Sequence, residues 1–322
     1  MKKILIISSN RLGDSILSSG INSYFRSLYK ESQIIFVCGP TPSELFISCK
    51  NISKVITLKK KKYSIHWILL WIKVFFNLWD CVVDLRGTAI SYFLITKKRK
   101  VFSSKVKNKN DHKIVNYSKL VGKKILKPNL NLNENSNSNE YLKLIRNVKK
   151  KNPIIAVSAS ANWKGKQWPK SRYRKLIFEL KKKKKFSNFK FVLLGSKDEI
   201  IDSSEISQGF SSKDVYNYVG LVPLSDVFLI IKECNLFIGN DSGLMHLSVA
   251  AGTPTIGLFG PSDINQYGPW GNNNLAISTP ESPNQLMGGE NFHHRNTSSL
   301  MLGLTTKKVE EKIIRFYEEL IK

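Results

Sequence analysis

Residues 237–254 constrain the fold more than any other stretch of the chain. An apolar run ends in a small polar turn, Gly239 to Gly243, and a helical pattern then covers residues 244–251 until Gly252 and Pro254 stop it. A strand, a tight turn and a helix N-terminus form a cradle for an anion, because free N–H groups and the positive end of the helix dipole meet there. A second apolar run at 255–259 completes a βαβ unit with its functional edge at the strand ends.

The same alternation extends along the whole chain. Expected strands cover residues 4–8, 34–38, 55–58, 81–85, 154–158, 191–194, 236–239 and 255–259; expected helices cover 14–29, 43–48, 65–79, 140–150, 170–182, 224–233, 243–251 and 306–321. Uninterrupted apolar strands separated by helices predict parallel sheets covered on both faces, an α/β class with two doubly wound, Rossmann-like domains. We expect domains at 1–150 and 151–322 facing each other across a cleft. An Asn-, Lys- and Ser-rich linker at about 127–140 separates them.

Charge and cysteine content narrow the functional class. The 322 residues carry a net charge of +27. Residues 1–150 hold 29 basic against 8 acidic residues, and residues 151–322 hold 22 against 16. This asymmetry favours an anionic partner for the first half, such as nucleic acid, a membrane surface or an acidic glycan, although an AT-rich genome would also enrich lysine. Four scattered cysteines without CxxC spacing predict neither disulfides nor zinc, which favours a cytoplasmic protein.

Two apolar stretches raise the question of membrane contact. Residues 4–7 are too short a run for a signal peptide and form an expected strand. Residues 65–79 are rich in Trp and Phe but shorter than the roughly 20 residues of a spanning helix, and they contain His66 and Lys73. Two interpretations stay open for them: an ordinary buried helix, or a peripheral membrane contact led by four lysines at residues 59–62.

Asp14 is the candidate general base. It follows the first expected strand and opens a helix, next to Gly13, which permits a sharp turn. A carboxylate at that edge can take a proton from an attacking hydroxyl. The alternative is that Asp14 is only the N-cap of its helix.

Further candidates follow strands of the second half. Lys166 lies in a Ser- and Lys-rich loop and suits a pyrophosphate, or else is one solvated lysine among 51 basic residues. Asp198 and Glu199 compete as the acceptor of ribose hydroxyls, and either can merely favour a helix N-terminus. His246 can donate to a phosphate or sugar oxygen, or be simply packed.

Missing motifs are also informative. No G-x-x-x-x-G-K-[ST] occurs, and no G-x-G-x-x-G follows the first strand, which argues against P-loop chemistry and a dinucleotide cofactor. No Asp-x-Asp pair is present to hold a divalent ion, and His293 and His294 have no carboxylate or cysteine at ligand spacing. We therefore expect an anion held by backbone, Lys and His, with no metal and no cofactor.

Several short stretches occur in a fixed order along the chain: Arg11-Leu12-Gly13-Asp14, Asp84-Leu85-Arg86-Gly87, Lys166-Gln167-Trp168-Pro169, Leu194-Gly195 with Glu199, Gly239-Asn240-Asp241-Ser242-Gly243-Leu244-Met245-His246 and Phe259-Gly260-Pro261. Together they resemble glycosyltransferase family 9, the ADP-heptose:lipopolysaccharide heptosyltransferase family, over nearly the full chain.

The resemblance implies a GT-B fold, with the acceptor bound mainly by the first domain, the nucleotide-sugar by the second, and the last helix packing back on the first. It implies an inverting, metal-independent transfer of a sugar, most commonly a heptose from ADP-heptose, to a lipopolysaccharide or lipooligosaccharide core. The implied site residues are Asp14 as general base; Lys166 and the turn Asp241, Ser242 and Gly243 for the diphosphate; Glu199 for the ribose; His246 near phosphate or sugar; and Arg11, Arg86 and Gly87 for the acceptor.

The implied partners are an ADP-linked sugar and an anionic, lipid-linked saccharide, met at the cytoplasmic face of the inner membrane. Two other classes stay open from the sequence. A non-catalytic nucleotide-sugar-binding homologue or scaffold would keep the fold without the reaction. Nucleic-acid binding has only the charge to support it, since no RNP-, KH- or zinc-type motif occurs, so no nucleic-acid partner is expected.

Overall fold

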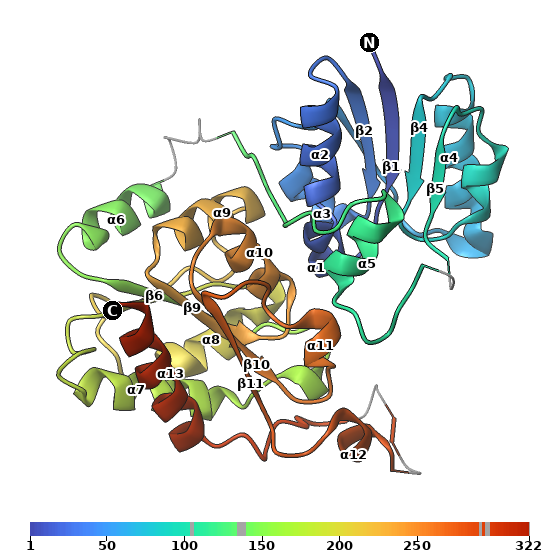
Figure 1. Ribbon diagram of the computed structural model, residues 1–322. Coiled ribbons are helices and arrows are strands. Elements are labelled where there is room, and N and C mark those ends of the chain that lie inside the picture. The colour runs from blue at the N-terminus through green and yellow to red at the C-terminus, as the bar shows by residue number, and fades with distance from the viewer. Residues whose placement is uncertain (104–105, 134–139, 290–291, 294–296, 322) are drawn as a thin grey trace. The chain divides into compact units, whose positions relative to one another are not determined.

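The computed structural model describes all residues except 104–105, 134–139, 290–291, 294–296 and 322. The chain forms two compact units, Met1–Glu134 and Asn135–Lys322, each built on one parallel sheet (Figure 1). The two α/β domains expected from the sequence are therefore confirmed. Within the described ranges, no helix combines the length and apolar character needed to span a bilayer.

The first unit contains a five-stranded sheet in the order β3-β2-β1-β4-β5. Its strands are β1 (Lys3–Ile7), β2 (Gln33–Cys38), β3 (Lys54–Thr57), β4 (Cys81–Asp84) and β5 (Arg99–Val101). All neighbouring strands are parallel. The order reverses between β1 and β4, so the loops after these two strands flank the switch point where α/β sheets bind ligands.

Helices cover both faces of this sheet: α1 (Leu12–Leu17), α2 (Gly20–Leu28), α3 (Pro40–Phe46), α4 (Ile65–Phe75) and α5 (Lys113–Leu120), with short 3₁₀ turns η1 (Lys62–Ser64) and η2 (Ala89–Phe93). Leu70 and Val74 of α4 are buried in one core cluster with Leu5, Val37 and Val82 of the sheet. Figure 1 shows α2 on the opposite side of the sheet from α4.

The single helix expected over residues 14–29 is two helices. It breaks at Ser18 and Ser19, where Ser18 Oγ donates to the Ser15 carbonyl and Ser19 Oγ accepts from the N–H of Asn129. A Cβ on Gly20 would lie 2.6 Å from the Leu126 carbonyl oxygen. The break is therefore imposed by a distant segment, about 110 residues away in sequence, that packs against Ser19 and Gly20.

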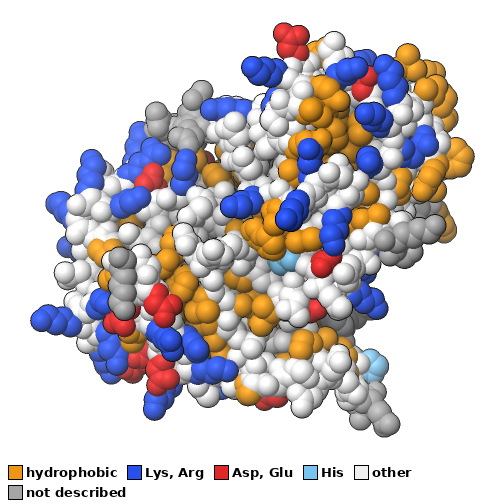
Figure 2. All heavy atoms as spheres, in the orientation of Figure 1, with side chains coloured by type: hydrophobic (Ala, Val, Ile, Leu, Met, Phe, Trp, Pro, Cys, Tyr) orange, Lys and Arg blue, Asp and Glu red, His pale blue; other side chains and the backbone are white. Residues whose placement is uncertain are grey.

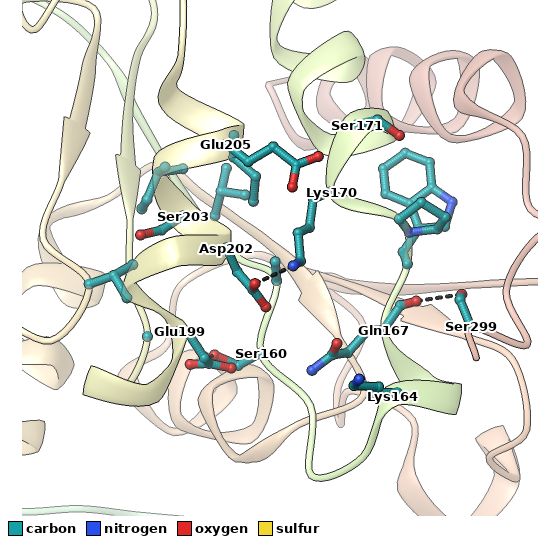
Figure 3. A pocket seen from close by; sticks show the side chains of 18 of the residues that line it. Ser160, Lys164, Gln167, Lys170, Ser171, Glu199, Asp202, Ser203, Glu205 and Ser299 are labelled. Carbon is teal, nitrogen blue, oxygen red and sulfur yellow. Dashed lines mark hydrogen bonds and ion pairs between the residues drawn. The ribbon is translucent and has the colours of Figure 1, made fainter. Parts of the chain in front are cut away.

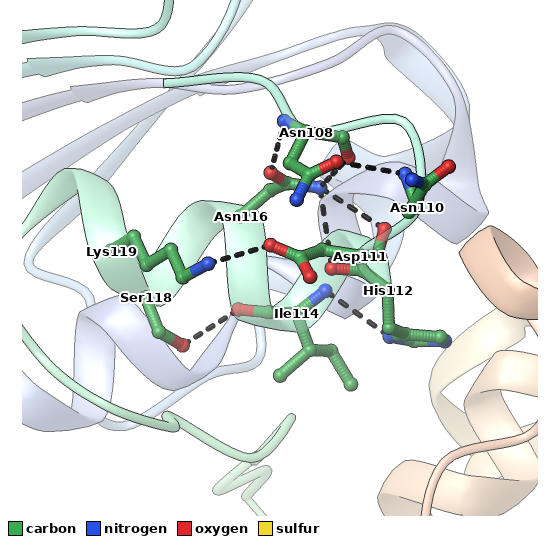
Figure 4. A network of polar contacts seen from close by, with 8 residues as sticks. All are labelled: Asn108, Asn110, Asp111, His112, Ile114, Asn116, Ser118 and Lys119. Carbon is green, nitrogen blue, oxygen red and sulfur yellow. Dashed lines mark hydrogen bonds and ion pairs between the residues drawn. The ribbon is translucent and has the colours of Figure 1, made fainter. Parts of the chain in front are cut away.

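Helix α5 was not expected from its short mixed sequence, and polar contacts define it. His112 is its N-cap, with Nδ1 accepting from the N–H of Ile114. The Asn116 side chain accepts from the N–H of Asn108 and donates to the carbonyls of Asn108 and Asp111 (Figure 4). This network fixes the loop before α5 and so fixes where α5 begins.

The second unit contains a six-stranded parallel sheet in the order β11-β10-β9-β6-β7-β8. Its strands are β6 (Ile154–Ser158), β7 (Lys190–Leu193), β8 (Val215–Asn217), β9 (Leu236–Asn240), β10 (Thr255–Phe259) and β11 (Asn274–Ser278). The order reverses between β6 and β9. The turn singled out in the sequence follows β9, at this switch point.

Its helices are α6 (Glu140–Lys149), α7 (Lys170–Lys182), α8 (Ile200–Ser207), α9 (Leu224–Glu233), α10 (Gly243–Ala251), α11 (Ile264–Tyr267), α12 (Pro283–Met287) and α13 (Thr306–Leu320), with 3₁₀ turns η3 (Lys164–Lys166) and η4 (Lys197–Glu199). Helix α10 ends at Gly252 in the left-handed conformation, where the sequence predicted the stop.

One detail of the domain division differs from expectation. Helix α6 belongs to the second unit and not to a first domain ending at residue 150, because Arg146 and Lys149 both pair with Glu233 of α9. The last helix, α13, places Val309 and Ile313 in the hydrophobic core of the second unit. Its packing on the first domain stays a prediction.

Gly239 in β9 sets the spacing between the two central strands. A Cβ there would lie 2.7 Å from the Ser158 carbonyl oxygen of β6. We expect Gly239→Ala to destabilise the protein by about 1–3 kcal/mol, because backbone of a neighbouring strand cannot move aside cheaply. Urea and thermal unfolding followed by circular dichroism measure the change. Gly289→Ala is the control, since no atom of the described, non-adjacent residues lies within 4 Å of that Cβ; equal stability of both variants would contradict the close strand contact.

Candidate functional site

The two loops at the second unit's switch point are joined by one buried amide. Asn240 ends β9 and is fully buried. Its Oδ1 accepts from the Trp168 N–H at 3.1 Å and from the Tyr173 hydroxyl at 2.8 Å. Its Nδ2 donates to the Ala159 carbonyl at 2.7 Å and approaches that of Ser160 at 3.4 Å. All the hydrogen-bonding positions of the amide are used, so the loop after β6 is held against the end of β9.

Tyr173 and Trp168 make this attachment rigid. Both are fully buried, and their rings meet edge to face with centroids 4.9 Å apart. Burial holds the pKa of the Tyr173 phenol well above its ordinary value, so the hydroxyl stays protonated and can donate to Asn240. The Trp168 indole N–H donates to the Leu304 carbonyl at 2.7 Å. Trp168 therefore attaches the loop that carries Lys166 both to Asn240 and to the segment at Leu304.

The predicted residues Lys166, Asp241 and His246 come together at this edge. Lys166 Nζ lies 2.6 Å from Asp241 Oδ2, and His246 Nε2 lies 3.9 Å from Asp241 Oδ1. The Asp241 side chain is 6% exposed and the Lys166 side chain 22%. Lys166 is thus a partner in a nearly buried ion pair, which excludes the alternative of a freely solvated lysine.

The N-terminus of α10 carries polar groups that the described residues do not satisfy. Ser242 is the N-cap residue, yet its side chain makes no cap hydrogen bond. Its Oγ, and that of Ser262 in the loop after β10, are buried without a hydrogen-bond partner among the described residues. Unpaired buried hydroxyls are costly and rare, so two of them after adjacent strands call for an additional group. Together with the free N–H groups of the first helical turn, they suit an anion.

A cavity of about 500 Å³ lies at the carboxyl ends of β6 and β7. Apolar side chains including Val157, Leu193 and Val219 form part of its wall, and Glu199 and Ser160 lie side by side in it (Figure 3). Ser160 Oγ donates to Glu199 Oε2 at 2.6 Å, and the Ser196 N–H and hydroxyl reach the same oxygen at 2.8 and 3.1 Å. Asp198 is exposed and does not line the cavity. Of the two competing carboxylates, the structure favours Glu199.

Further charged and polar groups line the cavity. Lys170, at the start of α7, is paired with Asp202 of α8 (Figure 3). Ser299 Oγ donates to the Gln167 carbonyl at 2.6 Å and so holds the 299 segment to the Lys166 loop. The cavity is a mainly apolar space with a few fixed hydrogen-bonding groups, which is how sites for small organic ligands are built.

In the first unit, Asp14 is not the N-cap of its helix. The N-cap of α1 is Arg11, and no side chain caps it. Asp14 lies in the first turn, where Ser9 Oγ lies 3.5 Å from its Oδ2, while its Oδ1 is buried with no hydrogen-bond partner among the described residues. A carboxylate with one committed and one unpaired oxygen at a strand end can accept a proton.

Lys113 lies near Asp14 and was not predicted. Burial lowers its pKa from the ordinary value, and the Asp14 carboxylate opposes that shift. Lys113 begins α5, whose start is set by the His112 cap, so no local motif marks it. The expected acceptor residue Arg11 is exposed beside this pair, and its charge also acts on Lys113.

Arg86 and Gly87 follow β4, across the switch point from Asp14. Buried Asp84 accepts from the N–H groups of Arg86, Gly87 and Thr88 at 2.9, 3.1 and 2.8 Å, which fixes the turn. Gly87 has φ +66, and a Cβ there would collide with the Phe102 carbonyl, so glycine is required. Arg86 Nη1 donates to Asn10 Oδ1 at 2.9 Å.

Several site residues could not be singled out in advance. Asn240 was part of a recognised turn, but only the structure shows its bonds to the β6 loop. Ser160, Ser262 and Asn10 are small polar residues in loops and carry no distinguishing pattern. In the described part of the chain, no group of three or more His, Cys, Asp or Glu side chains has metal-binding geometry. His293 lies outside any helix or strand, and His294 is outside the described residues.

The chain is similar to known proteins in both sequence and fold. The sequence profile of "Glycosyltransferase family 9 (heptosyltransferase)" matches residues 58–291. The chain is 24% identical over 288 residues to lipooligosaccharide heptosyltransferase 2 of Campylobacter jejuni, covering 85% of this chain and 87% of the relative.

Among solved structures, the glycosyl transferase family 9 protein of Veillonella parvula is similar with TM-score 0.74 and 18% identity, covering 99% of this chain and 97% of that one. The E. coli ADP-heptose lps heptosyltransferase II is similar with TM-score 0.73 and 19% identity over the full length of both chains. These likenesses, with the two parallel-sheet units, confirm the expected GT-B fold.

Asn240 should position the loop after β6 rather than only stabilise the sheet. We expect Asn240→Ala to speed amide hydrogen exchange in residues 159–168 by about 5- to 150-fold, because losing bonds worth about 1–3 kcal/mol releases that loop. Asn235→Ala is the matched control: Asn235 bonds to Ile154 at the other end of the same strands. Exchange that rises equally in both variants would assign Asn240 a purely structural role.

Proposed function

The chain belongs to glycosyltransferase family 9 and is a glycosyltransferase, and we propose that it transfers a heptose from ADP-heptose to a lipopolysaccharide or lipooligosaccharide core. One observation carries the proposal. In the second unit, a single sheet edge combines a cavity containing Glu199 with an uncapped helix N-terminus beside Lys166. A nucleoside diphosphate has two matching parts: a base and ribose, which suit the cavity, and a diphosphate, which suits the helix N-terminus.

The nucleoside would occupy the cavity. Its volume of about 500 Å³ is sufficient for a base and a ribose. Apolar residues such as Val157 and Val219 would pack on the base. Among the described residues, the three hydrogen bonds to the Glu199 carboxylate all reach Oε2, and Oε1 would accept from ribose hydroxyls. Carboxylates after a strand play the same role in dinucleotide-binding sites.

The diphosphate would bind at the N-terminus of α10. The N–H groups of Ser242 and Gly243 and the hydroxyls of Ser242 and Ser262 would donate to phosphate oxygens, and Lys166 would supply a point charge. Asp241 is anionic and would repel a phosphate. Its contacts with Lys166 and His246 support a different role, that of holding both cationic or donor groups in place.

Asp14 would act as general base. It would take the proton of the acceptor hydroxyl as that oxygen bonds to the anomeric carbon, while the bond from that carbon to the diphosphate oxygen breaks. Attack opposite the leaving group inverts the anomeric configuration. The negative charge that develops on the diphosphate would be stabilised by Lys166 and the α10 N-terminus, so the proposal includes no divalent ion.

The acceptor would bind to the first unit. Arg11, Arg86 and the backbone at Gly87 follow β1 and β4 at the same edge as Asp14. Cationic side chains at this edge suit the anionic saccharide of a lipopolysaccharide core. Because that acceptor is lipid-linked, the proposal includes a peripheral location at the cytoplasmic face of the inner membrane.

Replacing Asp14 tests the base. We expect Asp14→Asn to lower kcat by about 10²–10⁴-fold, the usual contribution of a general base, with donor affinity almost unchanged. Transfer is followed by mass spectrometry of the acceptor, and affinity by calorimetry. Asp111→Asn is the control, since Asp111 pairs with exposed Lys119 at the protein surface. Weaker donor binding with normal turnover would refute the role.

A thermal-shift screen tests the donor. At about 100 times Kd, we expect ADP-heptose to raise the Tm by roughly 5–10 °C, and UDP- and GDP-linked sugars to have little effect. The buffer contains EDTA, because the proposed site needs no divalent ion. Lys166→Met should abolish most of the shift. Equal shifts with all three nucleotides, or a shift that appears only when divalent ions are added, would contradict the proposal.

A further inference from the structure

Helix α4 is apolar on both sides. Its residues Leu70 and Val74 are buried in the core of the first unit. On the other side, Ile65, Ile68 and Ile72 are 43%, 60% and 53% exposed. Apart from His66 and Lys73 the helix has no ionisable side chain. A surface helix normally carries a polar outer face, so this one lacks a partner for its exposed side.

The exposed apolar area extends beyond the helix. The Trp71 indole N–H donates to the Phe93 carbonyl at 3.1 Å, which attaches η2 and the residues after it to α4. We call the combined set the α4–η2 surface: Ile65, Ile68, Leu69, Ile72, Phe76, Tyr92, Phe93 and Ile95, all exposed. Figure 2 shows hydrophobic side chains gathered along the edge of the first unit where Figure 1 places α4.

The charges around this surface are mainly positive. The two acidic residues nearest to it in sequence are Asp80, which pairs with Lys2 and Lys97, and Asp84, which is fully buried. Residues 45–79 hold seven lysines and no acidic residue, and residues 85–110 hold eight basic residues and no acidic one. Lysines 59–62 are all exposed, directly before α4. The Lys61 N–H donates to Nδ1 of buried His66 at 3.3 Å, which ties this lysine run to the first turn of the helix.

We infer that the α4–η2 surface and the lysines at residues 59–62 dock on an anionic lipid bilayer. Exposed aliphatic and aromatic side chains would enter the headgroup region while the lysines pair with acidic headgroups. A second copy of the chain is disfavoured as the occupant, because a two-fold contact would bring the same uncompensated lysines together.

The surface lies beside the proposed acceptor edge. The Arg86 guanidinium is 4.8 Å from the centre of the Trp67 ring of α4, and Arg86 also bonds to Asn10. Docking by α4 would therefore bring Arg86, Asn10 and the loop of Asp14 close to the headgroups. The link between this orientation and the acceptor rests on the proposed function. The inference that the surface contacts a membrane is independent of that function.

Vesicle co-sedimentation of the full chain tests the inference. We expect the natural chain to bind vesicles of phosphatidylethanolamine and phosphatidylglycerol and to bind little to phosphatidylcholine alone. Three variants should each bind at least about tenfold more weakly to the anionic vesicles: Ile68→Ser with Ile72→Ser, Phe93→Ser, and glutamine at residues 59–62. Two controls should bind like the natural protein. They are Leu28→Ser with Ile47→Ser, which are equally exposed, and glutamine at lysines 182–185.

The outcomes separate this inference from the transferase proposal. Vesicle binding is measured without donor, so it does not depend on transferase activity. The inference is wrong if the natural chain does not bind anionic vesicles. It is also wrong if the surface variants bind as well as the controls. A change of oligomeric state in sedimentation velocity, caused by Ile68→Ser with Ile72→Ser and without loss of vesicle binding, would assign the surface to a second copy. If the inference holds, the surface variants keep normal transfer to a soluble, delipidated acceptor and lose transfer to acceptor in vesicles.

Discussion

The four hydrogen-bonding positions of the Asn240 amide hold the proposed donor site together. Parallel strands leave the loops at their carboxyl ends free of the sheet, and a loop of about ten residues would be mobile without tertiary contacts. Asn240 fastens the β6 loop through Trp168, Tyr173 and Ala159, and Ser160 in turn holds Glu199. Residues from β6, β7 and β9 therefore depend on one buried side chain for their relative placement.

The charges of Lys166 and Asp241 offset each other at the carboxyl end of β9. Lys166 and Asp241 form a nearly buried ion pair, so the turn carries little net charge when no donor is bound. Desolvating an isolated lysine would be costly, and Asp241 offsets that cost while fixing the direction of the ammonium group. In the proposed complex, a diphosphate would compete with Asp241 for Lys166, and the hydroxyls of Ser242 and Ser262, unpaired among the described residues, would add donors.

In the first unit, helix α4 is apolar on its exposed side as well as on its buried side. The core of this unit uses only one side of the helix. Such a helix gains no solubility from its outer face and raises the risk of aggregation. The two interpretations left open by the sequence, a buried helix and a membrane contact, are therefore not exclusive: Leu70 and Val74 make it part of the core, while Ile68 and Ile72 remain available to a bilayer.

The sequence by itself determined the fold class, most long elements and the turn at residues 239–243, because apolar periodicity and Gly or Pro stops are local properties. It also brought forward Lys166, Glu199 and Asp14, although each had a plausible structural alternative. Only the tertiary structure decided that Asp14 does not cap α1, that Glu199 and not Asp198 lines the cavity, and that α6 and α13 belong to the second unit. It alone revealed Asn240 as the connection, the proximity of Lys113 to Asp14, and the short elements β5, α5, β8 and β11. These features depend on contacts between residues far apart in the chain, and local sequence patterns carry no information about such contacts.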